Sequence, residues 1–476
     1  MAYTYGILPS FGGVRMDLSP YLLPPDCSPD ACNMDTRSGS LRSAKGFSRV
    51  LQGMLPANET PIRMYIYPTE RGKRYLAVTL NKIWLYRSVT RVWESVYTFT
   101  ANLRPELIDF LPVRIGSEDR LLIAHGKGQM LQFNEADSEI TPFGSAEKLS
   151  DRRICCAELY FGRLFAAGDP LVPSRLYWSK APGGTRAIDD WRADPASENV
   201  SGGFVDVGID DDPITGLFAL SNQLLIFKRD TLYRLLGDRP GNYRVLPVDA
   251  PFRQPLQTAC VRYADRLYFL SEGGLCCYDG QTVRRPGAFR ALEPLLKSAD
   301  FGSAKAAACD DKLYFAIRSD SGQTYNDLVI EYDLLRDRYM LRRGFTAADL
   351  FGAHGLLYAL TGTGKIVVFD DSDTYDGDPI HAWWQTPKFD LGHKETNKTL
   401  LALIADGTGS ADVRVESNGG TYDARLTFPD TADSVGEIPL RGAGRIFRLR
   451  FSDADGAPLS IEAGVSLKYD VQRRPG

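Results

Sequence analysis

The sequence predicts an all-β protein, an irregular β-propeller of six to seven blades with an extended N-terminal arm and a C-terminal β-sandwich. Three observations predict this fold class. A short phrase, usually a basic or polar residue before Leu or Tyr and an apolar run, occurs seven times between Arg74 and Asp370. Turns rich in Gly, Asn and Asp accompany the copies, as is typical of β-hairpins. Helical periodicity is scarce, and we expect one short helical turn at 292–297.

The spacing of the copies indicates the architecture. Their second residues are separated by 46, 43, 60, 43, 46 and 44 positions. A four-stranded propeller blade needs about 40–50 residues, so one copy is expected in each blade. We expect each copy to be the leading strand of its blade, followed by a turn and a second strand. The copies begin at Arg74-Tyr75-Leu76, Arg120-Leu121-Leu122, Arg163-Leu164-Phe165, Gln223-Leu224-Leu225, Arg266-Leu267-Tyr268, Lys312-Leu313-Tyr314 and Leu356-Leu357-Tyr358.

Residues 1–60 differ from the repeats and are expected to form the N-terminal arm and a strand-closing segment. Gly12-Gly13, Pro20 and Pro24-Pro25 interrupt any regular element there. We expect an arm that lies on another surface, either of a second copy or of a neighbouring protein. The same segment could supply a strand that closes the ring.

The propeller is expected to occupy residues 61–370. The single step of 60 positions adds about 15 residues to one blade, and the surplus falls at 181–203, which is polar and rich in Gly. A long loop on a rigid scaffold often carries contacts, so we expect this one to contact a partner.

The C-terminal quarter of the chain has another character. Residues 371–379 read as an acidic linker. Residues 380–476 alternate apolar and polar side chains in short runs, such as 411–416 and 445–451. This length and rhythm predict a β-sandwich of about 100 residues.

The composition excludes several classes of protein. The 476 residues are 43% apolar and carry a net charge of −4, which disfavours disorder and a basic coat for nucleic acid. The sequence contains no run of about 18 apolar residues, so no membrane-spanning segment is predicted. The N-terminus lacks the basic start and apolar middle of a secretion signal, so we expect synthesis in a cytosol.

The eight cysteines are expected to be buried free thiols. None belongs to a pair of Cys-x-x-Cys motifs at zinc spacing. Cys27 and Cys32 lie close together and could pair, but a cytosolic origin disfavours a disulfide. The cysteines are Cys27, Cys32, Cys155, Cys156, Cys260, Cys276, Cys277 and Cys309.

No catalytic, cofactor-binding or metal-binding residues are predicted. The histidines His125, His354, His381 and His393 are scattered, and none stands in a zinc motif. The chain contains neither a Gly-x-Ser-x-Gly elbow nor a P-loop. We therefore expect a protein that is not an enzyme and uses no cofactor.

Three further features have both a functional and a structural interpretation. Asp320–Tyr325 resembles the Asp-box of sialidase propellers, but a single copy favours a plain turn between strands. The acidic runs 210–212 and 370–378 could bind a cation, yet they lack the ligand series of an EF-hand and favour solvated loops. Trp383-Trp384 could stack on sugars. At a domain junction, packing is the preferred interpretation of this pair.

Motifs spread over most of the chain carry a resemblance. The first part contains Phe11-Gly12-Gly13, Ser28-Pro29-Asp30-Ala31-Cys32-Asn33-Met34-Asp35, Gly39-Ser40-Leu41-Arg42 and Lys45-Gly46-Phe47. The middle contains Arg163-Leu164-Phe165-Ala166-Ala167-Gly168-Asp169, Ser174-Arg175-Leu176-Tyr177-Trp178-Ser179, Ile214-Thr215-Gly216-Leu217, Leu224-Leu225-Ile226-Phe227-Lys228 and Leu232-Tyr233-Arg234-Leu235-Leu236-Gly237. The last part contains Trp384-Gln385-Thr386, Asp390-Leu391-Gly392, Lys398 and Arg473-Arg474.

In this order the motifs resemble the virion propellers of tailed bacteriophages, namely the tail nozzle (tail tubular protein B) and the packaged-DNA stabilisation proteins. The departure is Asp210-Asp211-Asp212, where a Gly would be expected within the acidic turn. The resemblance implies a structural virion protein of the tail or neck, made in the host cytoplasm. It implies a homo-oligomeric ring, a hexamer, beside a portal-proximal or adaptor ring.

Such a head-to-tail joining ring or nozzle encloses DNA, retains or conducts it during ejection without reading its sequence, and anchors tail fibres or spikes. The resemblance brings no catalytic residues with it. A moderately acidic wall would let DNA slide, because fixed positive charge binds phosphates.

Two other functions stay open. One is a glycan-binding or glycan-cleaving propeller of a tail, suggested by the single Asp-box-like turn but lacking an evident carboxylate pair. The other is an intracellular propeller scaffold of the WD40 type, which lacks a recurring Trp-Asp or Gly-His signature here.

Overall fold

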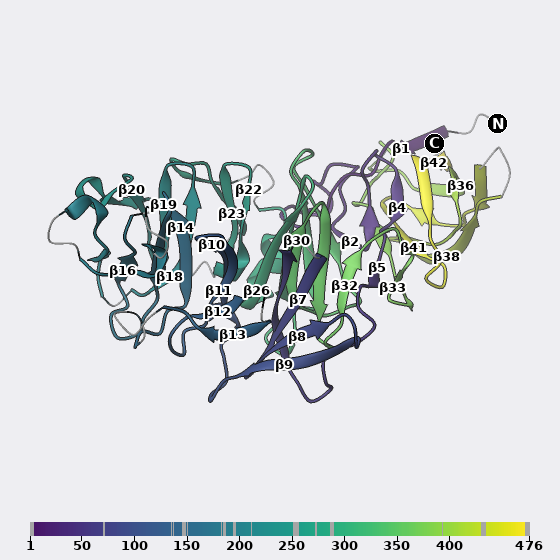
Figure 1. Cartoon of the computed structure of the whole chain (residues 1–476). Helices are drawn as coiled ribbons and strands as arrows, with labels where there is room; N and C mark the ends of the chain where they lie inside the picture. Colours follow the sequence, from purple (N-terminus) through teal and green to yellow (C-terminus); the bar gives the residue numbers. More distant parts are fainter. Residues whose placement is uncertain are drawn as a thin grey trace.

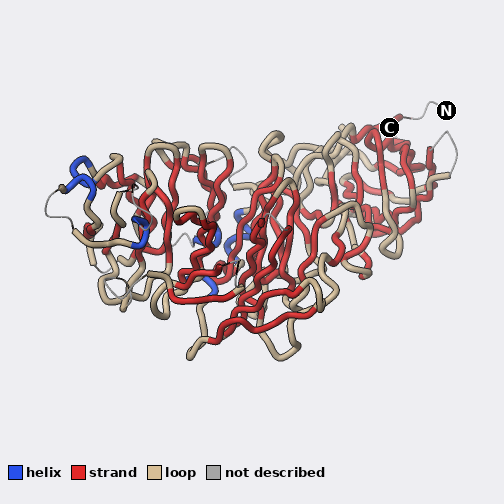
Figure 2. The backbone as a smooth tube through the Cα atoms, viewed as in Figure 1, coloured by secondary structure: helices blue, strands red, loops and turns tan. Residues whose placement is uncertain are grey.

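The computed structural model is built almost entirely of strands (Figure 2). It describes residues 4–69, 72–134, 136, 138–144, 149, 151–181, 183, 187–193, 197–210, 212–250, 257–271, 274–285, 290–392, 394–429 and 435–471. The described helices are short. They are η1 (Pro105–Leu107), η2 (Ala187–Asp189), η3 (Glu198–Val200), η4 (Pro240–Asn242), η5 (Gln257–Ala259) and α1 (Glu293–Ser298).

Seven antiparallel sheets follow one another along the chain as propeller blades, in agreement with the predicted fold class. Each of the first six is a four-stranded meander in sequence order. These six sheets are β6 (Pro61–Thr69), β7 (Gly72–Thr79), β8 (Lys82–Arg87) and β9 (Val92–Thr98); β10 (Asp109–Ile115), β11 (Glu118–Ala124), β12 (Leu131–Asn134) and β13 (Glu139–Pro142); β14 (Cys156–Tyr160), β15 (Arg163–Ala167), β16 (Arg175–Trp178) and β17 (Gly203–Asp206); β18 (Ile214–Leu220), β19 (Gln223–Lys228), β20 (Leu232–Leu236) and β21 (Arg244–Val248); β22 (Cys260–Tyr263), β23 (Arg266–Ser271), β24 (Gly274–Tyr278) and β25 (Val283–Arg284); and β26 (Asp300–Cys309), β27 (Lys312–Arg318), β28 (Leu328–Asp333) and β29 (Arg338–Arg342).

The repeated phrase is the second strand of each blade, so its expected position as the leading strand was wrong. The reason lies in how strands alternate their side chains between two faces. In β19, Leu224 and Ile226 join the core shared with blade three, whereas Leu225 and Phe227 join the core shared with blade five. A strand buried on both faces is apolar throughout, which makes it the most visible strand in the sequence.

Seven apolar clusters join neighbouring blades in turn and close the ring. The cluster between blade seven and blade one closes the circle, because it contains Leu360 and Ala77. A ring in which every blade shares a core with both neighbours is a propeller. Representative pairs for the other six interfaces are Leu85 with Leu121, Leu122 with Leu164, Phe165 with Leu224, Leu225 with Leu267, Leu270 with Leu313, and Ala316 with Leu357.

The seventh blade combines strands from both ends of the propeller. Its strands β30 (Ala347–Ala353), β31 (Leu356–Thr361) and β32 (Ile366–Phe369) are completed by β5 (Phe47–Arg49). Thus the N-terminal segment supplies the strand that closes the ring, the possibility left open by the sequence. β33 (Thr374–Tyr375) and β34 (Asp378–Pro379) extend the same sheet.

Two sheets form the sandwich, at the right of Figure 1, where the first and last strands of the chain lie side by side. One sheet has seven strands and the other five. The larger contains β1 (Thr4–Leu8), β3 (Met34–Asp35), β4 (Leu41–Ser43), β36 (Lys398–Thr408), β39 (Val435–Pro439), β40 (Ala443–Gly444) and β42 (Ser460–Val471). The smaller contains β2 (Asp30–Cys32), β35 (Trp383–Gln385), β37 (Ser410–Ser417), β38 (Gly420–Thr427) and β41 (Phe447–Asp453).

The N-terminal arm therefore lies on the chain's own sandwich, and its expected contact with a second copy or a neighbouring protein stays a prediction. β1 and β4 pair with β42, and β2 pairs with β35. Some apolar side chains of the arm, such as Phe11 and Val14, are buried in this sandwich core, whereas Ile7 and Leu22 are exposed.

The acidic linker is folded rather than free. Asp376 forms ion pairs with Arg49 and Lys365, at 2.8 and 2.7 Å. Tyr375 is buried and stacks on Phe47, with ring centroids 4.8 Å apart. The linker is thus held to the closing strand β5, so it fixes the sandwich against blade seven.

Other expectations concern individual residues. All eight cysteines are free, and all but Cys309 are buried. The short helical turn is α1, which spans Glu293–Ser298. Among the described residues, no helix combines the length and apolarity needed to cross a membrane.

Candidate functional site

Charged side chains gather where the innermost strands of the blades meet around the propeller axis. These strands are the first of each sheet, and they include β6, β10, β14, β26 and β30. They carry Arg63, Asp109, Glu158, Lys305 and Asp349. The last three are almost completely buried. Buried charges are costly unless they are paired or hydrogen-bonded. The partners of these groups therefore show which of them are already satisfied within the fold and which one is not.

Three carboxylates accept hydrogen bonds from the backbone of the next blade. Met64 donates its N–H to Oδ2 of Asp349 at 2.8 Å, from blade one to blade seven. In the same way, Asp109 accepts from the N–H of Ala157 at 3.1 Å, and Glu158 from that of Ala219 at 3.2 Å. These contacts tie blades together at the axis. Each carboxylate thus accepts a hydrogen bond that stabilises the packing of one blade on the next.

The ionisation of the axial groups follows from their burial. Burial raises the pKa of Glu158 to about 7, although Arg262 lies 3.1 Å away and favours the charged form. Burial also raises the pKa of Asp109 above its ordinary value. The Arg63 guanidinium lies 3.3 Å from Asp349. The described carboxylates at the axis are thus paired with a cation or hydrogen-bonded to the backbone. Of the two axial cations, Arg63 forms an ion pair with Asp349, whereas Lys305 has no hydrogen-bond partner among the described residues.

A buried arginine anchors the insertion of blade three. Arg163 donates from Nη1 to the carbonyl oxygens of Ser179 and Ser201, at 2.7 and 2.8 Å, and from Nη2 to that of Asn199 at 2.5 Å. These bonds hold the described ends of the 181–203 loop against β15. Residues 182, 184–186 and 194–196 of this loop lie outside the described residues, and its expected contact with a partner stays a prediction.

The three described histidines serve separate places in the fold. His125 is buried against the ring of Phe99, and its Nε2 lies 2.9 Å from the carbonyl oxygen of Gln129. His354 occupies the β30–β31 turn with φ of 52°. His381 lies 3.7 Å from Asp453 and is exposed. His393 lies outside the described residues.

The acidic and Asp-box-like motifs form turns. Asp212 is buried and accepts from the N–H of Asp230 at 2.9 Å and from Thr231 Oγ1 at 2.6 Å. Asp320 accepts from the N–H of Gly322 at 2.7 Å in the turn between β27 and β28. Asp211 lies outside the described residues. Among those described, no cluster of three or more His, Cys, Asp or Glu side chains could hold a metal ion.

The tryptophan pair belongs to the sandwich. Trp384 is buried, and its ring meets Phe11 edge-on with centroids 5.7 Å apart. Trp383 donates from its indole N–H to Asp30 at 2.9 Å and lies under the guanidinium of Arg450. Both rings therefore have protein partners, which supports packing rather than sugar stacking.

The clearest unpartnered surface is a groove beside β1, which we call the β1 groove. It has a volume of about 500 Å³. Large apolar side chains are exposed along it: Ile7 is 67% and Leu22 72% accessible, and Tyr5 and Tyr21 are more than half accessible. Tyr21 lies under the ammonium of Lys388 at 4.8 Å. Apolar side chains clustered in this way on a surface are typical of an interaction site.

The backbone of β1 adds to this surface. β1 pairs with β42 on one side, and no other described strand pairs with it. Its outer edge can therefore accept a further strand. The groove could not be recognised in the sequence, because its residues come from both ends of the chain: 5–8, 21, 22 and 25 in the arm, and 388–392, 394, 446 and 469 in the sandwich.

The chain is similar in structure to β-propeller proteins. No family model matches the sequence, and no curated protein sequence matches it. Three of the solved structures that resemble it are each 9% identical to this chain. They are the computationally designed Ika8 protein, with 68% of this chain and 99% of that chain covered at a TM-score of 0.41; the β-propeller domain of Cps50 (Swd1) from Myceliophteria thermophila, with 67% and 98% at 0.42; and BamB from Moraxella catarrhalis, with 77% and 97% at 0.41. At this identity the likeness concerns the fold alone.

Proposed function

We propose that the chain is a non-enzymatic structural protein of a tailed-phage tail or neck, which assembles into a ring around DNA. The observation that carries the proposal is the β1 groove, an exposed apolar surface with a free strand edge on the sandwich that adjoins the propeller. Its support from the sequence is the ordered set of motifs that resembles tail nozzle and packaged-DNA stabilisation proteins.

The proposed lumen lies between subunits rather than inside one propeller. Glu158, Lys305 and Asp349 are buried around the axis of a single subunit, so their side chains leave no passage for a duplex. A head-to-tail contact repeated around a closed rotation generates a ring, and we propose a hexamer. The net charge of −4 favours a lumen that conducts DNA without binding its phosphates.

In this ring, a second copy of the chain occupies the β1 groove. The neighbouring subunit would add an extended segment to the free edge of β1 and bury Ile7 and Leu22. Other surfaces of the subunit would contact the portal-proximal or adaptor ring and the fibres or spikes. One such surface would include the 181–203 loop.

The test is assembly of the purified protein, alone and with its portal-proximal partner. Charged groups in an apolar interface are costly, so the double variant Ile7→Asp, Leu22→Asp should weaken ring formation at least tenfold. Val89→Asp is the matched control, since Val89 is 96% accessible and lies in the β8–β9 turn of blade one. Mass photometry reports the oligomer, and electron microscopy of virions locates the protein.

If the double variant forms rings as readily as the wild type, the interface does not include the β1 groove. A monomer under all conditions, with no copy of the protein in virions, overturns the proposal. Binding to a glycan array instead would favour the glycan-binding alternative.

A further inference from the structure

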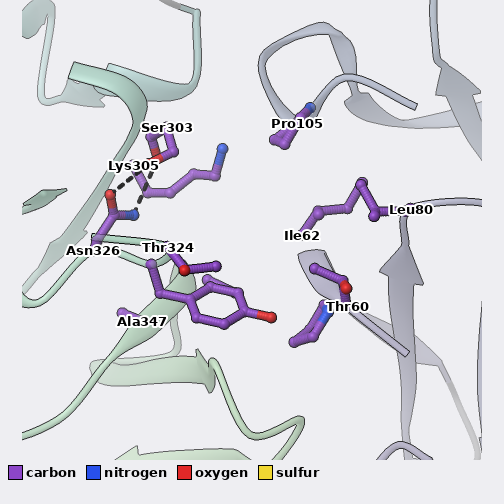
Figure 3. Close-up of a pocket in the computed structure, with 12 residues that line it drawn as sticks. Thr60, Ile62, Leu80, Pro105, Ser303, Lys305, Thr324, Asn326 and Ala347 are labelled. Carbon is purple, nitrogen blue, oxygen red and sulfur yellow. Dashed lines mark hydrogen bonds between the residues drawn. The ribbon is translucent and has the colours of Figure 1, made fainter. Parts of the chain in front are cut away.

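A small cavity lies where blades one, six and seven meet, close to the propeller axis (Figure 3). Its volume is about 180 Å³. Drug-sized ligands occupy pockets of roughly 300–1,000 Å³, so this cavity suits a molecule of only a few carbon atoms. Most of its wall is apolar. The apolar lining residues are Pro61, Ile62, Leu80, Pro105, Ala347 and Ala348.

One wall is polar and rigid. The hydroxyl of Ser303 donates to Oδ1 of Asn326 at 2.8 Å, and Nδ2 of Asn326 donates to the carbonyl oxygen of Ser303 at 3.0 Å. This reciprocal pair holds β26 against the β27–β28 connection, as the dashed lines of Figure 3 show. The wall is therefore formed before any ligand arrives.

Lys305 enters the cavity from β26. Its side chain is 1% accessible, and its Nζ has no hydrogen-bond partner among the described residues. Figure 3 shows the chain extending past Ser303 towards Pro105. An amine that is buried without an acceptor is costly, and this cost marks the place where a partner is missing.

The charged groups around Lys305 already have partners, which leaves the Lys305 ammonium without a counter-ion. Arg63 and Asp349 form an ion pair at 3.3 Å, and Asp349 also accepts from the N–H groups of Met64 and Leu350. Its oxygens are thus already engaged. Glu106, which follows the lining residue Pro105, pairs with Arg104. Protonated Lys305 therefore adds one uncompensated positive charge to the site.

We propose that this cavity binds a small organic monocarboxylate, whose carboxylate pairs with the Lys305 ammonium and whose alkyl chain contacts Ile62, Leu80 and Pro105. An inorganic phosphate fits less well, because it needs several donors and gains nothing from an apolar wall. The site is independent of the proposed ring, because none of these residues lies in the β1 groove.

The protonation of Lys305 couples binding to pH. Burial and the nearby Arg63 lower the pKa of Lys305 to about 7, and Asp349 and Glu106 oppose this shift. Tyr325 is the remaining titratable side chain in the wall, and burial raises its pKa. A bound carboxylate stabilises the ammonium, so binding at pH 8 should take up a proton.

The experiment is calorimetric titration of the full chain with butyrate and with its neutral isostere butyramide. We expect one butyrate per chain with a dissociation constant of about 1 mM or lower at pH 6.5. Butyramide should bind at least tenfold more weakly. Between pH 7 and pH 9, the affinity for butyrate should fall by about tenfold per pH unit, because Lys305 must be protonated.

Two variants make the outcome specific. Lys305→Met removes the charge, leaves an unbranched side chain that is one atom shorter, and should weaken butyrate binding at least tenfold. Lys297→Met is the matched control, since Lys297 is exposed on α1 and should leave binding unchanged. Equal binding of butyrate and butyramide, no binding by the wild type, or full binding by Lys305→Met each overturns the proposal.

Discussion

Asn33 joins the N-terminal arm to blade six and to the linker, and its replacement should separate the sandwich from the propeller. The residue is 2% accessible. Nδ2 donates to the carbonyl oxygens of Arg343 and His381, at 2.9 and 2.8 Å. Oδ1 accepts from the N–H of Arg343 at 3.0 Å and from the hydroxyl of Tyr375 at 3.1 Å. Every hydrogen-bonding group of this amide is therefore used.

The magnitude follows from these four bonds. A hydrogen bond contributes about 1 kcal/mol net, and each buried partner left unpaired adds to the loss. Asn33 also has φ of 52°, in the left-handed region that Asn tolerates better than Ala. We expect Asn33→Ala to lower the free energy of unfolding of the sandwich by about 4–5 kcal/mol. Asn33→Gly relieves the backbone but loses the amide, so it should cost about 1 kcal/mol less.

Calorimetry measures this effect. For a unit of about 150 residues, 4 kcal/mol corresponds to a midpoint lower by roughly 8–16 °C, and the sandwich should then melt before the propeller. Asn418→Ala is the control, since exposed Asn418 accepts a single hydrogen bond, from the N–H of Arg445. If Asn33→Ala costs no more than this control, the amide does not carry the junction.

Three further variants test the closing strand, the axis and the insertion. Phe47→Ala in β5 should cost about 3–5 kcal/mol by chemical denaturation, whereas exposed Val89→Ala should be neutral. Burial raises the folded-state pKa of Glu158 to about 7, above its unfolded value near 4.5, so its contribution to stability is complete at low pH and is lost as pH rises to about 7; Glu158→Gln should flatten that part of a plot of melting temperature against pH. Arg163→Leu removes three hydrogen bonds to carbonyl oxygens, so limited proteolysis within 181–203 should become at least tenfold faster, and unchanged cleavage would contradict the anchoring role.

The blade repeat could be predicted because its signal is local. A second strand such as β19 is buried on both faces, so it reads as an uninterrupted apolar run beside a Gly or Asp turn. The first strands are less visible. β26 contains Ala304 and Ala306–Ala308, small residues that fit close to the axis, with Lys305 between them, and this run carries no strand-like periodicity. In such a blade the second strand is easier to recognise in the sequence than the first.

The two candidate sites lacked any such local signal. Lys305 is a single lysine among alanines. It lacks a counter-ion only because Asp349 already accepts a hydrogen bond from the N–H of Met64 in another blade. The β1 groove depends on Tyr21 and Lys388 lying together, although 367 positions separate them. Sequence patterns report which face of a strand is buried, but not which distant strand buries it.

The pairing of the chain ends has a consequence for folding. β5 can complete blade seven only after β32 exists, and β1 and β4 can pair only after β42 exists. Blades one to six use strands that are adjacent in sequence, so they can form early. Closing a loop over most of the chain has a high entropic cost and slows folding. The apolar strands β1 and β4 of the arm would therefore stay unpaired until β42 forms. The pairing of β42 would be the last folding step, and it would join propeller and sandwich into one cooperative unit.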